Sequence, residues 1–130
     1  IEIILKTAES IRVLGNTYKL EQVILNLLSN SKDALAVRNS RSNNDKKTIE
    51  ISAYSQGSSA VIEITDNGDG IPSDIKDKIF DPFFTTKEPD KGTGLGLSIV
   101  YSIIQELKGT LEAESEEGKF TKMKISLPSE

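Results

Sequence analysis

Two tight turns constrain the fold of this chain more than any other feature. Residues 48–54 and residues 60–65 are apolar, alternating segments, and the turn QGS at residues 56–58 separates them. Residues 110–113 and residues 120–127 are separated in the same way by a turn that contains EEG. A short turn with glycine between two such segments predicts a β-hairpin, and the two strands of a hairpin pair antiparallel. The sequence therefore predicts a mainly antiparallel sheet.

Two other segments have the spacing of amphipathic helices. Apolar residues recur every three or four positions over residues 17–38, and either Asn16 or Thr17 is suited to cap this helix. A second helix is predicted over residues 95–107, and Gly109 marks its expected stop. Each helix has one apolar face, which must be buried against the sheet.

The order of the segments predicts the fold class. Residues 1–6 and 11–14 have the composition of two short strands joined by a polar turn, and Pro72 and Ser73 begin a short helix that is expected to end near Phe80. Hairpins alternating with helices indicate an α/β two-layer sandwich (α+β), with a mainly antiparallel mixed sheet covered on one face by about three helices. All 130 residues are expected to form one domain, which can bury roughly two thirds of its unfolded surface.

The composition excludes several kinds of chemistry. The chain has no His and no Cys, which removes catalytic triads, histidine metal ligands, disulfides and a phosphohistidine on this chain. A formal net charge of −4 is unfavourable for non-specific binding to nucleic acid. No apolar run approaches the roughly 18 residues of a membrane span. Because the only Met is Met123, we expect the chain to be part of a longer protein.

Asn26 and Asn30 are the first candidate functional residues. They lie four positions apart in the first predicted helix, so that their side chains stack on one side of it, at the border of the apolar face. Two amides at such a border need partners. They can form hydrogen bonds to a neighbouring helix or to the sheet, or an amide oxygen can be a ligand of a hard cation such as Mg²⁺. The residues alone leave both interpretations open.

The run DNGDG at residues 66–70 directly follows a predicted strand. A tight turn needs one or two such residues, whereas this segment consists of them entirely. It is not a calcium loop, because Gly68 and Gly70 stand where oxygen ligands are required. A carboxylate of Asp66 at the end of a buried strand needs a hydrogen-bond donor, and the exocyclic amine of a purine is suitable. Gly68 and Gly70 would then allow a flat ring to lie against the backbone.

A second glycine-rich run, GTGLGL at residues 92–97, leads directly into a helix. It is either a flexible hinge or a phosphate-binding loop, in which unpaired amides and the helix N-terminus face the anion. Its spacing is neither that of a Rossmann fingerprint nor that of a Walker A loop.

The segment between the two glycine-rich runs, FDPFFTTK at residues 80–87, holds three of the four Phe residues. It either anchors a loop on the core or forms a lid that carries Lys87 and Lys91 towards phosphates and offers Phe side chains to a partner domain.

Taken in this order, these segments resemble those of the catalytic, ATP-binding domain of two-component sensor histidine kinases, in the Bergerat-fold superfamily. The stretch NLLSNSKDA at residues 26–34 is similar to the N box, and residues 66–70 to the first glycine box. Residues 80–87 are similar to the F box and residues 92–97 to the second glycine box. The resemblance covers nearly the whole chain, and the sequence of the F box is similar to that of nitrogen-regulation and dicarboxylate sensors.

The resemblance implies a role for each matching residue. Asn30 would be a ligand of the Mg²⁺ that bridges the ATP phosphates, with Asn26 assisting nearby, and Asp66 would accept a hydrogen bond from the adenine amine. Lys87 would reach the γ-phosphate, so that Asn26 and Lys87 are the two expected catalytic residues. The remaining expected ATP-binding residues are Gly68, Gly70, Ile71, Phe80, Thr86, Lys91, Gly92, Thr93, Gly94, Leu95, Gly96, Leu97 and Thr121.

The resemblance also implies a reaction and partners. The domain would transfer the γ-phosphoryl group of ATP to a His on a separate helical dimerisation domain, and a response regulator receiver domain would act downstream. The isolated domain is expected to be a cytoplasmic monomer without a nucleic-acid partner. The parent protein would be a homodimer that can be anchored in a membrane.

Asn26 bears on the alternatives. In related ATPases the corresponding position resembles a Glu that activates water, whereas an amide cannot act as a general base at neutral pH. This favours phosphoryl transfer over hydrolysis. The alternatives at this point are a Bergerat-fold ATPase, an anti-sigma-type serine kinase, and a nucleotide-binding module of a degenerate kinase.

Overall fold

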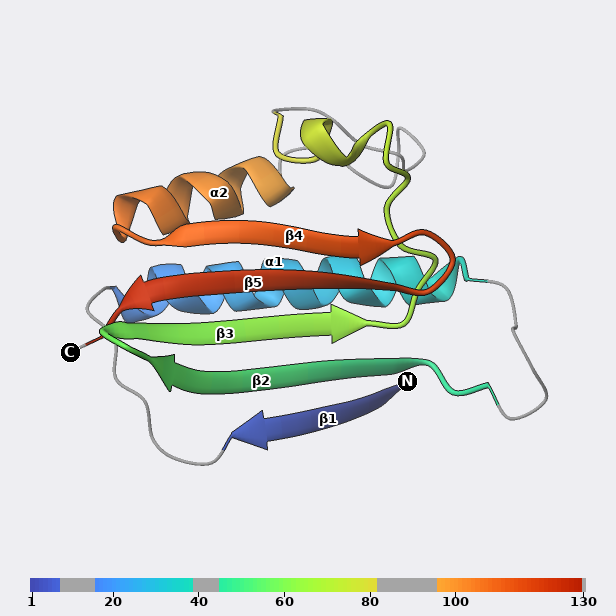
Figure 1. Cartoon of the computed structure of the whole chain (residues 1–130), viewed down its shortest axis with the longest axis horizontal. Coiled ribbons are helices and arrows are strands. Elements are labelled where there is room, and N and C mark those ends of the chain that lie inside the picture. Colours follow the sequence, from blue (N-terminus) through green and yellow to red (C-terminus); the bar gives the residue numbers. More distant parts are fainter. Residues whose placement is uncertain (8–15, 39–44, 82–95, 130) are drawn as a thin grey trace.

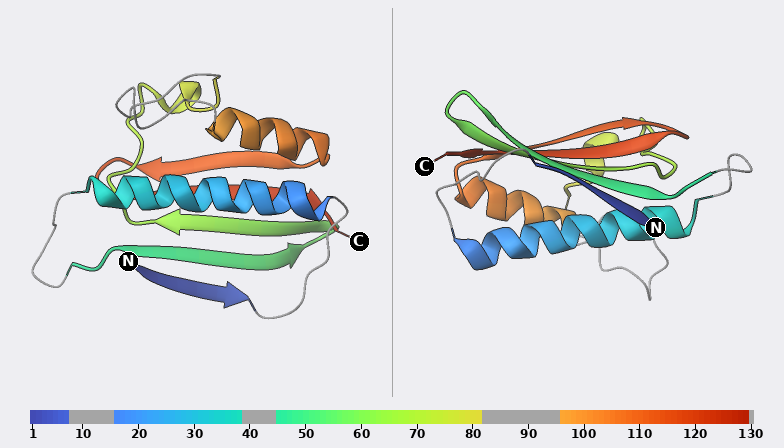
Figure 2. Two further views of the ribbon diagram at one scale, coloured as in Figure 1. Left: turned by 180° about the vertical axis from the view of Figure 1, so that it is seen from behind. Right: turned by 90° about the horizontal axis from the view of Figure 1, so that it is seen from below.

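One mixed sheet with helices on a single face organises the molecule. A computed structural model describes residues 1–7, 16–38, 45–81 and 96–129. In this part of the chain, five strands form a sheet in the order β1-β2-β3-β5-β4, and both α-helices cover the same face (Figures 1 and 2). The predicted α/β two-layer sandwich is therefore confirmed. The elements are β1 (Glu2–Thr7), α1 (Thr17–Ala36), β2 (Thr48–Gln56), β3 (Ser59–Asp66), the 3₁₀ turn η1 (Lys76–Lys78), α2 (Gly96–Glu106), β4 (Thr110–Glu116) and β5 (Phe120–Pro128).

Both predicted hairpins are present. β2 pairs antiparallel with β3, β4 pairs antiparallel with β5, and β3 and β5 then pair with each other. Gly57 and Gly118 in the two turns have φ angles of 62° and 84°, which residues with a Cβ rarely adopt. The turn glycines on which the prediction rested are therefore required by the backbone itself.

β1 is the parallel strand at one edge of the sheet. It pairs with β2 in a register that runs from Glu2 opposite Thr48 to Thr7 opposite Ala53. Parallel neighbours need a crossover connection, and α1 lies between these two strands in the chain. The second strand predicted at residues 11–14 lies outside the described residues.

α1 begins as its sequence predicts. Asn16 is the N-cap, and its side-chain oxygen accepts hydrogen bonds from the backbone N–H groups of Tyr18 at 2.9 Å and Lys19 at 3.2 Å. The helix ends at Ala36, slightly before the predicted end at residue 38. Arg38 follows it and forms a two-pronged ion pair with Asp45, at 2.9 and 2.8 Å, while its side chain is only 1% exposed. The pair joins the end of α1 to the segment that leads into β2.

The end of α2 differs from the prediction in one respect. The N–H of Gly109 bonds to the carbonyl of Ile104, and the N–H of Lys108 bonds to the carbonyl of Gln105, which is the Schellman pattern. The residue in the left-handed conformation is Lys108, with φ of 67°, and not Gly109. Gly109 is needed for a different reason, because a Cβ there would lie 2.4 Å from the carbonyl oxygen of Ser126 in β5.

The short helix predicted over residues 72–80 is wrong in extent. Only η1 forms, and the backbone bonds around it join Ile75 to Pro72, Lys78 to Ile75 and Asp81 to Lys78. These three-residue steps are those of successive tight turns, in which a long helix does not develop. In the described part of the chain, two α-helices rather than about three cover the sheet.

The core fills the space between the sheet and the helices. α1 contributes a buried stripe at three- and four-residue spacing, and α2 adds a second stripe beside it. Among the described helices, none has both the length and the apolar character that crossing a membrane requires. The buried core residues are Val23, Leu27, Leu35, Ile49, Ile64, Ile79, Val100, Ile103, Ile104, Leu111, Met123, Ile125 and Leu127.

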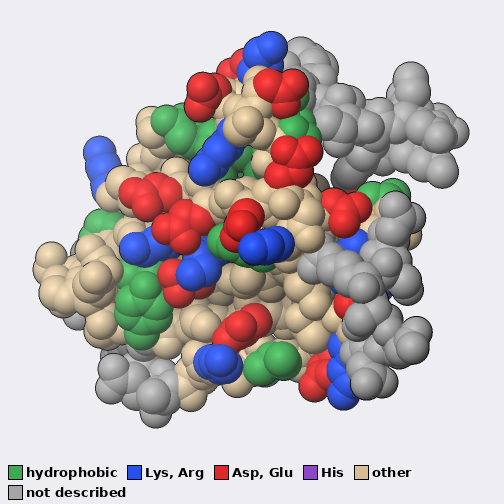
Figure 3. Space-filling model, turned by 45° about the vertical axis from the view of Figure 1, so that its right-hand side comes forward, with side chains coloured by type: hydrophobic (Ala, Val, Ile, Leu, Met, Phe, Trp, Pro, Cys, Tyr) green, Lys and Arg blue, Asp and Glu red, His purple; other side chains and the backbone are tan. Residues whose placement is uncertain are grey.

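The opposite face of the sheet carries mixed charges. Lys122 of β5 lies 3.8 Å from Glu63 of β3 and 3.9 Å from Glu114 of β4. Acidic and basic side chains are interspersed on this side of the molecule (Figure 3). Such exposed pairs contribute little stability, and their arrangement is that of a solvated surface.

Candidate functional site

Three polar side chains lie next to one another across three strands at one end of the sheet. Asp66, the last residue of β3, pairs with Thr121 of β5, and Thr121 pairs with Ser115 of β4. Asp66 is 4% exposed and Thr121 is 8% exposed, so that both are buried polar residues. We call Asp66, Thr121 and Ser115 the polar row. Asp66 and Thr121 were expected from the sequence, whereas Ser115 was not.

The backbone of the loop that follows β3 holds the Asp66 carboxylate in place. The N–H of Gly68 donates a hydrogen bond to Oδ1 of Asp66 at 2.9 Å. A Cβ at Gly68 would lie 2.8 Å from this same oxygen and 3.2 Å from the Cβ of Ala34 in α1. A side chain at residue 68 would therefore displace the carboxylate and crowd Ala34, because the loop passes between the carboxylate and the helix.

The same loop lies against the turn between β4 and β5. Gly70 has a φ of 76°, and a Cβ there would lie 2.4 Å from the carbonyl oxygen of Glu116. The N–H of Gly118 donates a hydrogen bond to the carbonyl of Asp69 at 2.6 Å. Gly68 and Gly70 are thus both positions of close approach, while the expectation that they let a flat ring lie against the backbone stays a prediction. In this structure the close neighbours that a Cβ would meet are other parts of the protein.

Asn67 fastens the other side of the loop. Its side-chain oxygen accepts a hydrogen bond from the N–H of Thr48 at 2.8 Å, and its amide donates to the carbonyl of Lys46 at 2.7 Å. Within the DNGDG run, the sequence gives Asn67 no role of its own. An Asn in a turn commonly bonds to backbone close by in the chain, whereas these two bonds reach residues 19 and 21 positions away, so that no local signal identifies them.

Asn26 and Asn30 are half-buried residues of α1. In the described part of the chain, neither side-chain amide forms a hydrogen bond with the protein. The structure therefore does not support the interpretation that these amides join α1 to a neighbouring helix or to the sheet. Asn30 lies one helical turn before Ala34, whose Cβ is the neighbour of Gly68, so Asn30 and the Asp66 loop are at the same end of the sheet.

Ile71 and Phe80 have protein partners. The N–H of Ile71 donates a hydrogen bond to Oγ of Ser115 at 2.6 Å, and the Ile71 side chain packs against the core. The ring of Phe80 stacks on Tyr101 of α2, with ring centroids 5.5 Å apart and planes inclined by 25°, and it also packs against the core. For Phe80 the structure supports the core-anchoring interpretation of this segment.

The second glycine-rich run enters the described structure only at its end. Gly96 is the first residue of α2, and a Cβ there would meet no atom within 4 Å. The side chain of Leu97 is partly buried and packs against the core. The other predicted site residues lie outside the described residues, and they are Thr86, Lys87, Lys91, Gly92, Thr93, Gly94 and Leu95.

The described side chains offer some of the ligands that a hard cation needs, but not a complete set. Among the described residues, no three His, Cys, Asp or Glu side chains gather into a possible metal site. The amide oxygen of Asn30 is the type of ligand that Mg²⁺ accepts when phosphate oxygens and water complete its shell. The residues therefore fit a cation that arrives with phosphates, and not one held by protein carboxylates.

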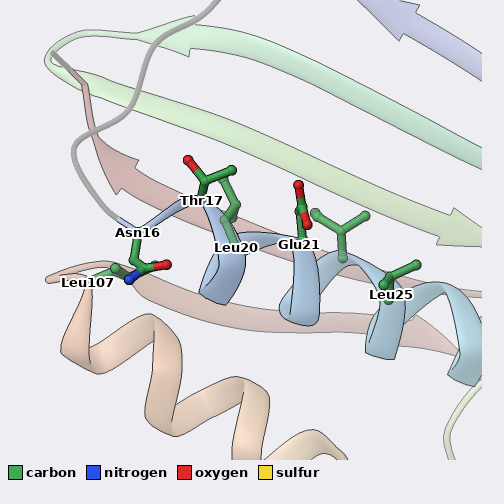
Figure 4. A pocket seen from close by; sticks show the side chains of 7 residues that line it. Asn16, Thr17, Leu20, Glu21, Leu25 and Leu107 are labelled. Atoms are coloured by element: carbon green, nitrogen blue, oxygen red, sulfur yellow. The ribbon is translucent and has the colours of Figure 1, made fainter.

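A groove at the opposite end of α1 has a different chemistry (Figure 4). It has a volume of about 470 Å³, and of the described residues that line it only Glu21 is charged. A negative side chain and apolar walls do not suit a polyphosphate. The lining residues are Asn16, Thr17, Leu20, Glu21, Ile24, Leu25 and Leu107.

The chain carries a buried carboxylate and a glycine loop beside an Asn-bearing helix in a two-layer sandwich, and its sequence matches the model of one protein family. The chain belongs to the histidine kinase-, DNA gyrase B- and HSP90-like ATPase family, whose model matches residues 15–130. It is similar to sensor kinase CckA of Brucella abortus (strain 2308), which is 44% identical over 85% of this chain and 12% of that protein. It is also similar to sensor histidine kinase ZraS of Escherichia coli (strain K12), which is 38% identical over 85% of this chain and 22% of that protein.

Solved structures agree with these relatives. The nucleotide-free catalytic domain of histidine kinase ThkA has a TM-score of 0.80 at 31% identity, covering 98% of this chain and 79% of that chain. Full-length ShkA in complex with AMPPNP has a TM-score of 0.82 and covers 98% of this chain and 25% of that chain; at 22% identity it shows the fold alone. The chain is therefore an ATP-binding catalytic domain of the sensor histidine kinase type. It spans only 12% and 22% of the lengths of the two curated relatives.

Proposed function

We propose that residues 1–130 form one catalytic domain, which binds ATP with Mg²⁺ and donates the γ-phosphoryl group to a His on a separate protein segment. One observation carries the proposal: the buried carboxylate of Asp66 is fixed by the Gly68 N–H at the same end of the sheet as Asn30, whose amide has no hydrogen bond to the described part of the chain. A purine and a phosphate-bound cation need these two kinds of group at one site.

Asp66 is suited to bind the base. A carboxylate can accept several hydrogen bonds, and the Gly68 N–H holds one of its oxygens in a fixed orientation. A bond from an exocyclic amine to such a buried, charged acceptor contributes roughly 1.5–3 kcal/mol. The neighbouring Thr121 hydroxyl adds a second polar group in the same row. Gly68 and Gly70 keep the loop narrow, and Ile71 would form part of the apolar wall.

Asn30 is suited to act at the phosphate end. Its amide oxygen would hold the metal, with Asn26 one helical turn away. When bound, Mg²⁺ neutralises charge on the phosphate oxygens. By their resemblance to the glycine box and the F box, residues 92–97 would wrap the phosphates, and Thr86, Lys87 and Lys91 would approach the γ-phosphate. Gly96 and Leu97 would take part through their backbone at the start of α2.

The proposed reaction needs a second protein segment. A ring nitrogen of the acceptor His attacks the γ-phosphorus, the bond from that phosphorus to the β–γ bridging oxygen breaks, and ADP leaves. Since this chain has no His, it supplies the donor side only. Asn26 cannot activate a water molecule as a carboxylate can, and this favours transfer over hydrolysis. The proposed partners are a helical dimerisation domain of a homodimeric parent protein and a downstream response regulator.

Calorimetric titration with AMPPNP, with either Mg²⁺ or EDTA present, tests the proposal. We expect binding that is tighter with Mg²⁺, and we expect Asn30→Ala to remove this dependence on Mg²⁺. Incubation with γ-labelled ATP should leave no label on the chain and little free phosphate. Absence of AMPPNP binding by the folded chain would contradict the proposal. Substantial ATP turnover by the chain alone would instead favour a self-contained ATPase.

A further inference from the structure

Ser115 is a residue of β4, and its hydroxyl links the Asp66 loop to the hairpin of β4 and β5. Its Oγ accepts the hydrogen bond from the N–H of Ile71 at 2.6 Å and donates to the carbonyl of Phe120 at 2.9 Å. The same oxygen lies 3.5 Å from Oγ1 of Thr121. One hydroxyl group therefore touches the end of the glycine loop, the start of β5 and the central member of the polar row.

The position does not require a hydroxyl for packing. On the same face of the sheet, the next residues of β4, β5 and β3 are Ala113, Met123 and Ile64, which are all apolar. Ala113 shows that a small apolar side chain fits beside the core at this distance from the helices. The polar row marks the point at which this face changes from core to site. The hydroxyl of Ser115 is explained by its hydrogen bonds and not by its volume.

The protons of the polar row can be assigned. Ser115 has one hydroxyl proton, which it donates in its hydrogen bond to the Phe120 carbonyl. The 3.5 Å contact with Thr121 can then use only the Thr121 proton, which is directed towards β4. Once its proton is used in this way, the Thr121 hydroxyl can act only as a hydrogen-bond acceptor towards any other group. Ser115 therefore influences both the place of the loop and the orientation of the Thr121 hydroxyl.

We propose that Ser115 is a positioning residue of the nucleotide site, which holds Gly70 and Ile71 against β4 and orients Thr121 so that the adenine-binding edge is formed before the ligand arrives. This inference rests on the proposed function. Ser115 itself does not touch the base. It acts through the Ile71 N–H and the Thr121 hydroxyl, and it lies at the far end of the row from Asp66.

Titration of Ser115→Ala and Ser115→Thr with ATP and with ITP tests the inference, because ITP has a carbonyl in place of the adenine amine. Losing a neutral hydrogen bond of about 0.5–1.5 kcal/mol should raise the Kd for ATP about two- to twelvefold. The Kd for ITP should change less, so that the ATP preference falls. Ser115→Thr keeps the hydroxyl and should retain the wild-type Kd and preference. The control Ser52→Ala, on the opposite face of the sheet, should change neither.

The outcomes separate this inference from the proposed function. If the wild-type chain binds no ATP, the proposed function fails and this inference with it. If the wild type binds ATP and Ser115→Ala has the same Kd and the same ATP preference, only the role of Ser115 is wrong. Should Ser115→Ala not fold, Ser115→Cys has nearly the same size and a weak hydrogen-bonding group, and it replaces Ser115→Ala. Amide hydrogen exchange adds a measurement on the wild type, in which an unprotected Ile71 N–H would also overturn the inference.

Discussion

The two ends of α1 have opposite chemistries. At the C-terminal end, Ala34 contacts a glycine loop that carries the buried carboxylate of Asp66, and hydrogen bonds fasten this loop on two sides. At the N-terminal end, Leu20 and Leu107 line an open groove, and Glu21 is the one charged side chain among the described residues that line it. The described residues of the polar end supply hydrogen-bond donors and acceptors, whereas those of the groove are mostly apolar. A ligand such as ATP is selected by donors and acceptors, and the nucleotide site is therefore proposed at the polar end.

This comparison shows why the volume of a hollow is a poor guide in this protein. The groove lies between the start of α1 and Leu107, the residue that follows α2, and none of the described residues that line it is positively charged. The polar end was recognisable from residue types that are expensive to bury, above all Asp66. Four substitutions test this difference between the two ends of α1.

Of the four substitutions, Asp45→Ala should have the largest effect. It should lower the stability of the protein by acting at the polar end of α1. It leaves the buried guanidinium of Arg38 without its carboxylate, and breaking such a pair lowers the free energy of unfolding by about 3 kcal/mol or more. Urea denaturation measures this change. Lys119→Ala, which removes an exposed ion pair with Glu116, is the matched control and should change stability by less than about 0.5 kcal/mol. Equal effects of the two substitutions would show that Arg38 tolerates the loss.

Asp66→Asn should weaken ATP binding about tenfold or more. Asparagine keeps an oxygen for the Gly68 N–H and loses only the charge that strengthens the bond to the amine. Calorimetry gives the Kd, and Glu21→Gln at the groove end should leave it unchanged. An unaltered Kd for a folded Asp66→Asn variant would remove the base-binding role from the polar end.

Leu20→Ala should separate stability from binding. Leu20 is partly buried against the core, so that its truncation should cost about 1–2 kcal/mol, less than for a fully buried leucine. The Kd for ATP should remain within about twofold of the wild type, because the groove takes no part in nucleotide binding. Loss of ATP binding in a folded Leu20→Ala variant would contradict the division between the two ends of α1.

Lys108→Gly should have the smallest effect, and it should stabilise. Lys108 has a φ of 67°, which costs a residue with a Cβ up to about 1 kcal/mol relative to glycine. Thermal unfolding should show a slightly raised Tm. Gly109→Ala should do the opposite, because its Cβ would meet the carbonyl oxygen of Ser126. A rise in Tm for Gly109→Ala would show that the close contact with β5 relaxes readily.

Much of the fold was predictable because its signals are local. Alternating segments around Gly57 and Gly118 define the hairpins, and Asn16 together with the apolar periodicity defines α1. The short helix over residues 72–80 was overestimated, because Pro72 and Ser73 mark a helix start but do not supply the buried face that extends one. Gly109 was assigned as a helix stop, although its true constraint is a strand distant in sequence.

The candidate site was predictable to the extent that its residue types are unusual. Asp66, Gly68 and Gly70 are recognisable because a run of turn residues after a buried strand needs an explanation. Ser115 was missed, since a lone serine in a strand carries no signal of its own. The hairpin register would have placed it beside Thr121, but that register depends on the turn at residues 117–119.

The hairpins, the two amphipathic helices, the boxes that resemble those of histidine kinases and the lack of an acceptor His can all be read from the sequence. Local periodicity, glycine and charge are sufficient for these, since each depends on neighbours in the chain. Three features become visible only in the folded molecule. β1 lies parallel to β2, and Asn67 and Ser115 fasten the Asp66 loop. Gly109 leaves room for the backbone of β5. Those features depend on which strands become neighbours, and burial of the whole core settles that choice.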